Sequence, residues 1–320
     1  MKVLVTGASG FLGRGLLPRL VENDNRQVVA ACRQPIPNLD PRVSPVSIGD
    51  LDAANDWSRA LADVDVVIHA AARAHIDDPR SADALAEFRR VNRDASLNLA
   101  RQAAGSGVRR LVFISSIKVN GESTPAGRPF CADDTPAPEG AYAVSKWEAE
   151  EGLRELSVET GMEVVILRPP LVYGPGVGAN FLRMLQWIDR RLPLPLALVD
   201  NRRSLVSRCN LVDLVVTCLD HPRAANRSIL VSDGEDLSTS ELLRRLGNAL
   251  QRPARLLPCP VACLRGGAAL LGRRDLAGRL LDSLQVDISE TRRVLDWAPP
   301  QSVDDALREL AQAYRGESAG

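Results

Sequence analysis

The chain has 320 residues, its 40 Lys and Arg balance its 40 Asp and Glu, and 45% of its residues are hydrophobic. This length suits one large two-lobed α/β protein or two modest domains. Nucleic-acid-binding domains are usually strongly basic, so the zero net charge argues against nucleic acid as the main partner.

The N-terminal sequence MKVLVTGASG lacks the long apolar run of a signal peptide. No run of about 18 apolar residues occurs elsewhere, so we expect no membrane span. The fairly apolar stretch 256–271 is broken by Pro and Gly, and there we expect a packed helix rather than a membrane-surface helix. The six cysteines form no CxxC and only three histidines are present, so no metal site is expected. These features favour a cytoplasmic protein with free thiols.

Short apolar runs alternate with helical patterns through the first half of the chain, which predicts βαβ units and a Rossmann-type, doubly wound parallel sheet. The runs are nearly continuous in Val, Ile and Leu, as in strands covered on both faces. The expected strands are residues 3–5, 28–32, 43–48, 64–69, 111–115 and 164–167. The expected helices lie near residues 12–21, 57–61, 84–104 and 142–159.

After residue 168 the alternation stops, and Pro and Gly crowd residues 169–178. We therefore predict a dinucleotide-binding domain of residues 1–168, to which about residues 205–230 return. Residues 169–204 and 231–320 are predicted to form a smaller substrate-binding lobe.

A Gly-rich turn, TGASGFLG (residues 6–13), directly follows the first strand and opens a helix. The glycines allow a tight turn, close approach of a pyrophosphate, and close packing of helix on strand. The unpaired N–H groups at the start of the helix favour an anion. We therefore expect a nicotinamide dinucleotide to contact Gly7, Ser9, Gly10, Phe11, Leu12 and Gly13.

The end of the second strand bears on which dinucleotide binds. An NAD site usually carries Asp or Glu there for the ribose 2′-OH, whereas this strand ends in Arg33. A guanidinium binds phosphate with a fork of donors, and Arg14 could approach the same phosphate. We therefore favour NADP over NAD, with solvated arginines as the alternative.

Two further strand ends are expected to contact the cofactor. Asp50, after the third strand, is placed at the adenine amino group. Ala70, Ala71 and Ala72 end the fourth strand with small side chains, where backbone can approach a ligand. His69, just before them, is expected to pack rather than to catalyse.

Tyr142 and Lys146 stand four residues apart in YAVSK, on one face of the predicted helix. A tyrosine normally titrates near pH 10, and a neighbouring Lys⁺ together with an oxidised nicotinamide favours the phenolate. Tyr142 could then give or take a proton near neutral pH.

Together these motifs resemble the extended short-chain dehydrogenase/reductases, the group that includes the nucleotide-sugar epimerases and dehydratases. The matching stretches are TGASGFLG, HAAA, SSIKVNG, YAVSK, RPPLVYGPG, NRRSLV and NLVDLV. The resemblance makes Tyr142 the acid/base, makes Lys146 the group that binds the nicotinamide ribose, and makes Ser116 the hydroxyl that holds the reacting oxygen. It implies further cofactor contacts at Leu51, Asn92 and Pro169.

The pair after Ser116 limits the chemistry. In the sugar 4,6-dehydratases of this family, Asp-Glu follows this hydroxyl and eliminates water, but here Ile117 and Lys118 stand in those places. Isoleucine cannot exchange a proton, so a dehydratase is not expected. Ile117 would suit the apolar C6 methyl of a 6-deoxy sugar, with simple packing of Ile117 and a solvated Lys118 as the alternative.

By the same resemblance, Asn180 and Arg203 are expected to hold the diphosphate of a UDP-sugar, together with sugar contacts from Ser116, Ile117, Lys118 and Tyr142. SSIKVNGE and NRRSLV resemble a bacterial subgroup near polysaccharide gene clusters, which suggests a role in O-antigen (lipopolysaccharide) biosynthesis. We favour an NADPH-dependent reductase of a UDP-4-keto-6-deoxy-N-acetylhexosamine. One alternative is a UDP-hexose 4-epimerase with tightly bound NAD, and another is a non-catalytic NADP-binding regulator. For the quaternary structure we consider a homodimer.

Overall fold

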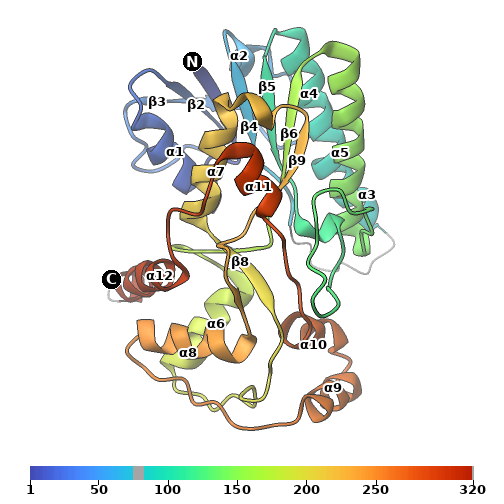
Figure 1. Cartoon of the computed structure of the whole chain (residues 1–320). Helices are drawn as coiled ribbons and strands as arrows, with labels where there is room; N and C mark the ends of the chain where they lie inside the picture. Colours follow the sequence, from blue (N-terminus) through green and yellow to red (C-terminus); the bar gives the residue numbers. More distant parts are fainter. Residues whose placement is uncertain (75–82, 319–320) are drawn as a thin grey trace.

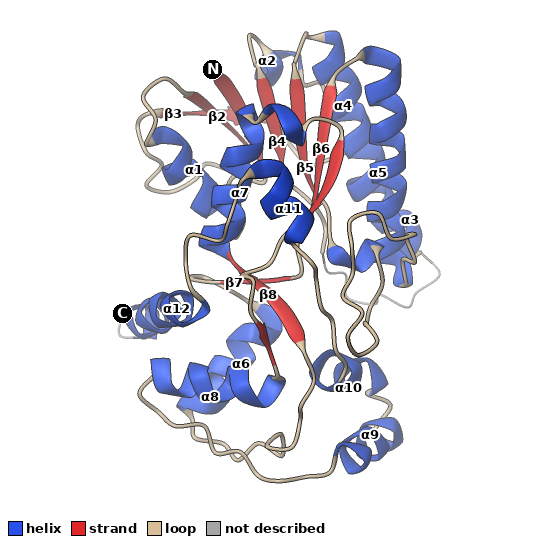
Figure 2. Ribbon diagram, viewed as in Figure 1, coloured by secondary structure: helices blue, strands red, loops and turns tan. Residues whose placement is uncertain are grey.

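The computed structural model describes residues 1–74 and 83–318, which fold around a parallel sheet of seven strands with the order β3-β2-β1-β4-β5-β6-β9 (Figures 1 and 2). Every neighbouring pair of these strands runs parallel. The strands are β1 (Lys2–Thr6), β2 (Gln27–Cys32), β3 (Val43–Ser47), β4 (Val66–His69), β5 (Arg110–Ile114), β6 (Glu163–Arg168) and β9 (Arg227–Leu230). The predicted Rossmann-type α/β fold is confirmed.

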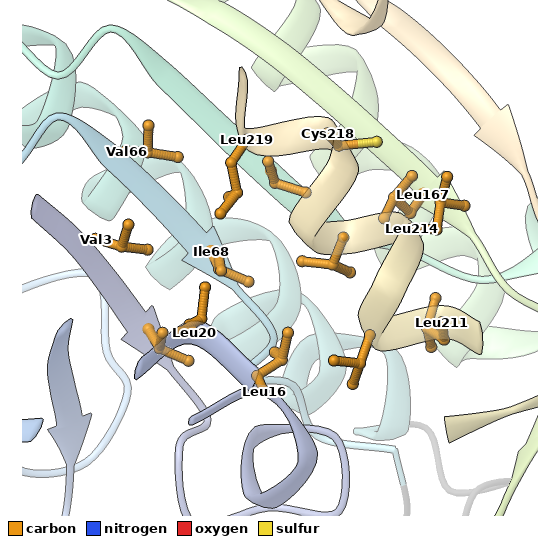
Figure 3. Close-up of a cluster of buried hydrophobic side chains, with 14 of the residues drawn as sticks. Val3, Leu16, Leu20, Val66, Ile68, Leu167, Leu211, Leu214, Cys218 and Leu219 are labelled. Carbon is orange, nitrogen blue, oxygen red and sulfur yellow. The ribbon is translucent and has the colours of Figure 1, made fainter. Parts of the chain in front are cut away.

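Side chains alternate along each strand, so the sheet has an apolar core on each face. Val3 and Val5 enter one core, whereas Leu4 enters the other. The first core is covered by α1 (Gly13–Val21) and α7 (Arg208–Asp220), as Figure 3 shows for Leu16, Leu20, Leu211 and Leu214.

The opposite core is covered by α2 (Ser58–Leu61), α4 (Ala95–Gly105) and α5 (Gly140–Thr160). The helix expected over residues 84–104 is present, but its middle is a wider turn: α3 (Ala84–Phe88) leads through a π-helical segment (Arg89–Asp94) into α4.

A second, three-stranded sheet has the order β10-β8-β7, with β8 (Arg203–Ser207) between β7 (Leu171–Tyr173) and β10 (Asp236–Leu237). A third core joins it to α6 (Ala179–Asp189), α8 (Thr239–Ala249) and α12 (Val303–Ser318). Segment α11 (Ser289–Leu295) instead packs Val294 and Leu295 against the core of the large sheet. The division into two lobes by residue number stays a prediction.

The apolar stretch 256–271 forms α9 (Val261–Leu270), which is followed by α10 (Arg274–Leu281). Val261 and Leu264 of α9 are partly buried and pack against the third core, as expected of a packed helix, although none of the side chains of α9 is fully buried. Among the described residues, no helix combines the length and apolar character needed to cross a membrane.

Candidate active site

The carboxyl ends of the parallel strands lie at one edge of the sheet, and the predicted site residues follow them there. The Gly-rich turn follows β1, the alanines follow β4, and Ser116 follows β5. Tyr142 and Lys146 lie in the first turns of α5. The topology therefore gathers motifs from four separate parts of the sequence.

The Gly-rich turn has the close packing that its glycines predict. Gly7 has φ +68°, and a Cβ there would come within 2.7 Å of the Ala71 nitrogen. A Cβ on Gly13 would collide with the Gly7 carbonyl oxygen. Ser9 and Gly10 are exposed, and Phe11 and Leu12 are half-buried. An open turn that only glycine can form, at the start of a helix, fits a dinucleotide pyrophosphate.

The sequence suggested an unpaired Arg33 at the end of β2, but the structure pairs this side chain with a carboxylate. Its Nη1 lies 3.1 Å from Oδ1 of Asp50, and both side chains are largely exposed. The guanidinium that favoured a 2′-phosphate is therefore already paired with a carboxylate, which weakens the argument for NADP over NAD. Arg14 is also exposed, and its Nε donates to the Ser9 carbonyl oxygen at 3.0 Å.

His69 is a structural residue, as expected. Its ring nitrogens lie 2.6 Å from the Thr6 hydroxyl and 2.7 Å from the Ser96 hydroxyl. Burial, and then the charge of Lys146, lower the pKa of His69 to about 3, so the ring is neutral. Thr6 also accepts from the Ala71 N–H at 3.2 Å, which fixes the loop of Ala70, Ala71 and Ala72 beside the Gly-rich turn.

Two residues expected to contact the cofactor form hydrogen bonds within the protein. Asn92 is fully buried, donates to the Arg73 carbonyl and to Ser145, and accepts from the Arg73 N–H at 2.8 Å. The carbonyl of Pro169 accepts from the Ile117 N–H at 3.0 Å. In this structure both residues hold loops in place, and their contacts with a cofactor stay predictions. Leu51 is half-buried against the apolar core beneath the sheet.

The two serines after β5 have different roles. Ser115 is buried and donates to Glu150, so its hydroxyl is occupied. Ser116 is half-buried, and its hydroxyl favours the phenolate of Tyr142, which opposes the effect of burial on the pKa of that phenol. This arrangement agrees with the choice of Ser116 over Ser115 as the hydroxyl at the reacting oxygen.

The pKa of the Tyr142 phenol is raised, whereas the sequence predicted that its phenolate would be favoured. Burial raises the pKa of its phenol, and the hydrogen bond with Ser116 opposes that rise. The cause is the desolvation of the phenol itself. Burial also lowers the pKa of Lys146, from its ordinary value of 10.5, to about 7. A lysine that is charged only in part at neutral pH gives the phenolate little help.

Lys146 is 1% exposed, and its Nζ lies 4.0 Å from the centre of the Phe113 ring. Within the described residues its ammonium group forms no hydrogen bond, although Glu150 one turn later favours its charged form. A buried ammonium without a hydrogen-bond acceptor fits the role expected of it, binding the hydroxyls of a nicotinamide ribose.

The pKa of Lys146 predicts a pH-dependent stability. Between about pH 7 and pH 10.5 the unfolded chain holds a proton on this lysine that the folded chain has lost, so the free energy of unfolding rises with pH across this window. Lys146→Met should therefore raise the unfolding free energy at about pH 6 by roughly 1–4 kcal/mol, with a gain near zero at about pH 10. Urea titrations at both pH values measure this difference.

Lys118→Met is the matched control, because Lys118 is 35% exposed and pairs with Glu122 on the surface. It should change stability by less than about 1 kcal/mol at either pH. An effect of Lys146→Met that is the same at both pH values would contradict a titration of this lysine.

A buried ion pair braces the loop that carries Ser116. Glu150 is fully buried, and Nη2 of Arg168, itself 2% exposed, donates to its Oε2 at 2.6 Å. Arg168 also donates to Oδ1 of Asn120 at 2.9 Å, and Asn120 donates to the Cys131 carbonyl. The network joins α5, β6 and the segment after Ser116.

Ile117 packs in a core, and the predicted contact with a sugar methyl is not supported. It is 3% exposed and lies in a cluster with Leu230, Leu284, Val286 and Ile288. The alternative that Ile117 merely packs is therefore correct. Lys118 is not simply solvated, because its Nζ lies 2.6 Å from Oε1 of Glu122.

The two residues predicted to hold the diphosphate, Arg203 and Asn180, have different surroundings. Arg203 is half-buried, and its Nη1 donates to the Asp282 carbonyl at 2.9 Å. Burial lowers its pKa, while Asp282 and Glu122 favour the charged form. Asn180 is exposed in the first turn of α6, with no hydrogen bond to Arg203.

Sequence reasoning missed Arg208, at the first position of α7. Its guanidinium lies 5.3 Å from the Phe11 ring, and a Cβ on Gly15 would meet its Cδ at 3.1 Å. Burial lowers the pKa of Arg208, and it forms no hydrogen bond or ion pair within the described residues. This cation is therefore available beside the Gly-rich turn, and no motif marks it because its neighbours are about 190 residues away in the sequence.

Comparison with known proteins agrees with this geometry. Residues 3–231 match the model of the NAD dependent epimerase/dehydratase family. A UDP-glucose 4-epimerase of Vibrio cholerae is 46% identical over 313 residues, which cover 98% of this chain and 95% of the relative.

Solved structures share the fold at lower identity. A UDP-glucuronic acid 4-epimerase from Bacillus cereus in complex with NAD superposes with a TM-score of 0.81 at 21% identity, covering 99% of both chains. A UDP-glucose 4-epimerase with UDP-glucose from Thermotoga maritima gives a TM-score of 0.79 at 19% identity, over 99% of this chain and 100% of that one.

Proposed function

The chain belongs to the NAD dependent epimerase/dehydratase family, and from that premise we propose that it is a UDP-hexose 4-epimerase that works with a retained NAD. The observation that carries the proposal is the 46% identity, along almost the whole chain, to a UDP-glucose 4-epimerase. The grouping of Ser116, Tyr142 and Lys146 at the edge of the sheet supports it.

The residues beside the Gly-rich turn suit the cofactor. Gly7 and Gly13 leave the turn open, Arg208 supplies a cation beside Phe11, and Lys146 offers a buried ammonium without an acceptor. When bound there, NAD supplies a reversible hydride acceptor for C4 of the sugar. The pairing of Arg33 with Asp50 leaves NAD as the better-supported choice over NADP.

In this mechanism the positive charge of oxidised NAD would favour the phenolate of Tyr142, which takes the proton of the 4-hydroxyl and later returns it. Ser116 hydrogen-bonds the same oxygen and orients it toward the phenol. Lys146, half-charged near neutral pH, shifts its charge as Tyr142 changes protonation. The side chains thus move a proton at one oxygen in both directions, as an epimerisation requires.

The two positions that carry the acidic pair of the dehydratases hold other residues here. A dehydratase needs an acid and a base at C5 and C6, whereas Ile117 is buried in a core and Lys118 is paired with Glu122. The reductase of a 4-keto sugar, which the sequence favoured, needs the same proton donor and an external NADPH. Two arguments for the reductase are weakened, because Arg33 is paired with Asp50 and Ile117 is buried. A merely regulatory protein is set aside by family membership and the intact site.

The test is incubation of the purified protein with UDP-glucose and with UDP-N-acetylglucosamine, with no cofactor added. We expect the 4-epimer to form at constant mass in at least one reaction, detected by proton NMR, and NAD to be released when the protein is denatured. No epimer from either sugar, together with NADPH-dependent reduction of a UDP-4-keto sugar, would refute the proposal in favour of the reductase.

A further inference from the structure

Helix α9 exposes an apolar face that nothing in the described chain covers. Its outward positions include Ala262, Cys263, Gly266 and Leu270, which recur at helical spacing and are all exposed. Leu270 is 91% exposed and Leu271, directly after the helix, is 76% exposed. A helix at the surface of a soluble protein normally turns polar side chains outward, so this face is suited to a partner.

The segment around α9 is also strongly basic. Residues 251–281 contain six arginines and one aspartate, a net charge of +5 in a chain whose total is zero. Arg265 pairs with Asp282, and Arg252 pairs with Asp189. Arg255, Arg273 and Arg279 are exposed and form no ion pair within the described residues. The exposed leucines are thus flanked by free positive charge.

The position of α9 leaves this surface accessible. Figure 1 shows α9 and α10 at the end of the molecule away from the N-terminus and the large sheet. The loop before α9 adds Leu257, which is 51% exposed. With ten residues, α9 is too short to cross a bilayer, so a membrane contact made by this helix would lie at the interface.

We propose that this surface, residues 255–279, docks the protein on an anionic membrane. Leu270 and Leu271 enter the boundary between headgroups and acyl chains, while Arg255, Arg273 and Arg279 reach the lipid phosphates. A negatively charged surface complements both features of the segment. The inference rests on exposure and charge alone and does not depend on the proposed function.

A second copy of the chain fits this surface less well. In a two-fold symmetric dimer the same patch faces itself, so the free arginines of one copy would approach those of the other. Like charges in contact are unfavourable, whereas a bilayer containing anionic lipid neutralises them. The charge therefore selects a membrane over self-association.

The experiment is sedimentation of the full chain with vesicles of phosphatidylcholine alone and of phosphatidylcholine mixed with phosphatidylglycerol. We expect binding to the mixed vesicles, weaker binding as salt rises, and little binding to phosphatidylcholine alone. Changing Leu270 and Leu271 together to Glu should lower binding at least about tenfold. Changing Arg255, Arg273 and Arg279 to Gln should lower it about fivefold for each arginine.

Val158→Glu is the matched control, because Val158 is 88% exposed on the distant helix α5 and should leave binding unchanged. The Leu270 and Leu271 variant should keep the thermal unfolding transition of the wild type, which shows that it is folded. Equal binding to both kinds of vesicle, or full binding by that variant, would overturn the proposal. So would a dimer in solution that the variant dissociates, without vesicle binding by the wild type.

Discussion

Replacing Tyr142 by Phe should lower the proposed turnover of UDP-hexose by about a hundred- to ten-thousand-fold, because this change removes the group that we propose to carry the proton of the 4-hydroxyl. Ser116 favours the phenolate of Tyr142, and the Tyr142 ring packs edge-on against Phe88 with 5.8 Å between the ring centroids. Phe keeps the ring and its packing, so the fold and the binding of NAD should be nearly unchanged. Turnover numbers and thermal unfolding of both proteins measure the two effects.

Tyr173→Phe is the control for loss of a phenol elsewhere. Tyr173 is buried in the core around the three-stranded sheet and donates to Oδ2 of Asp233 at 2.8 Å. This change should lower stability and leave turnover within about threefold of the wild type. If Tyr142→Phe kept more than about a tenth of the activity, Tyr142 would not be the acid/base.

The largest loss of stability is expected from Glu150→Gln. This change keeps the shape of the side chain but leaves the guanidinium of Arg168, 2% exposed, without its counter-charge. Removing one partner of a buried ion pair costs about 3–5 kcal/mol. The free energy of unfolding measured by urea titration should therefore fall by an amount in that range. Part of the loss should be recovered when Arg168 is also replaced by Met.

The neighbouring residue provides the control. Glu151 is 47% exposed and pairs with Arg154 on the surface, so Glu151→Gln should cost less than about 1 kcal/mol. Equal effects of the two substitutions would mean that the pair of Glu150 and Arg168 does not brace the loop that carries Ser116.

Much of the fold could be predicted because its signals are local. Most strands of the large sheet up to β6 appear as short runs rich in Val, Ile and Leu, with β3 (VSPVS) the exception. The predicted bounds of these six strands lie within two residues of those in the structure. The Gly-rich turn and the spacing of Tyr142 and Lys146 are local as well. Ser116 was separated from Ser115 by resemblance, and the hydrogen bond from Ser115 to Glu150 supplies the physical reason.

The rest depends on contacts between distant parts of the chain. Asp50 neutralises Arg33 from the next strand, Arg208 reaches Phe11 from another helix, and the burial of Ile117 depends on residues near 284–288. The rise in the pKa of Tyr142 follows from desolvation, which residue spacing does not reveal. A cytoplasmic location and a homodimer stay predictions.

The central claim is that hydride leaves C4 and returns to C4 within one enzyme. The most direct measurement uses UDP-glucose that carries deuterium at C4, incubated with the purified protein and no added cofactor, and followed by NMR and mass spectrometry. We expect UDP-galactose with the deuterium still at C4 and with unchanged mass. Conversion only with added NADPH, or loss of the deuterium to solvent, would contradict it.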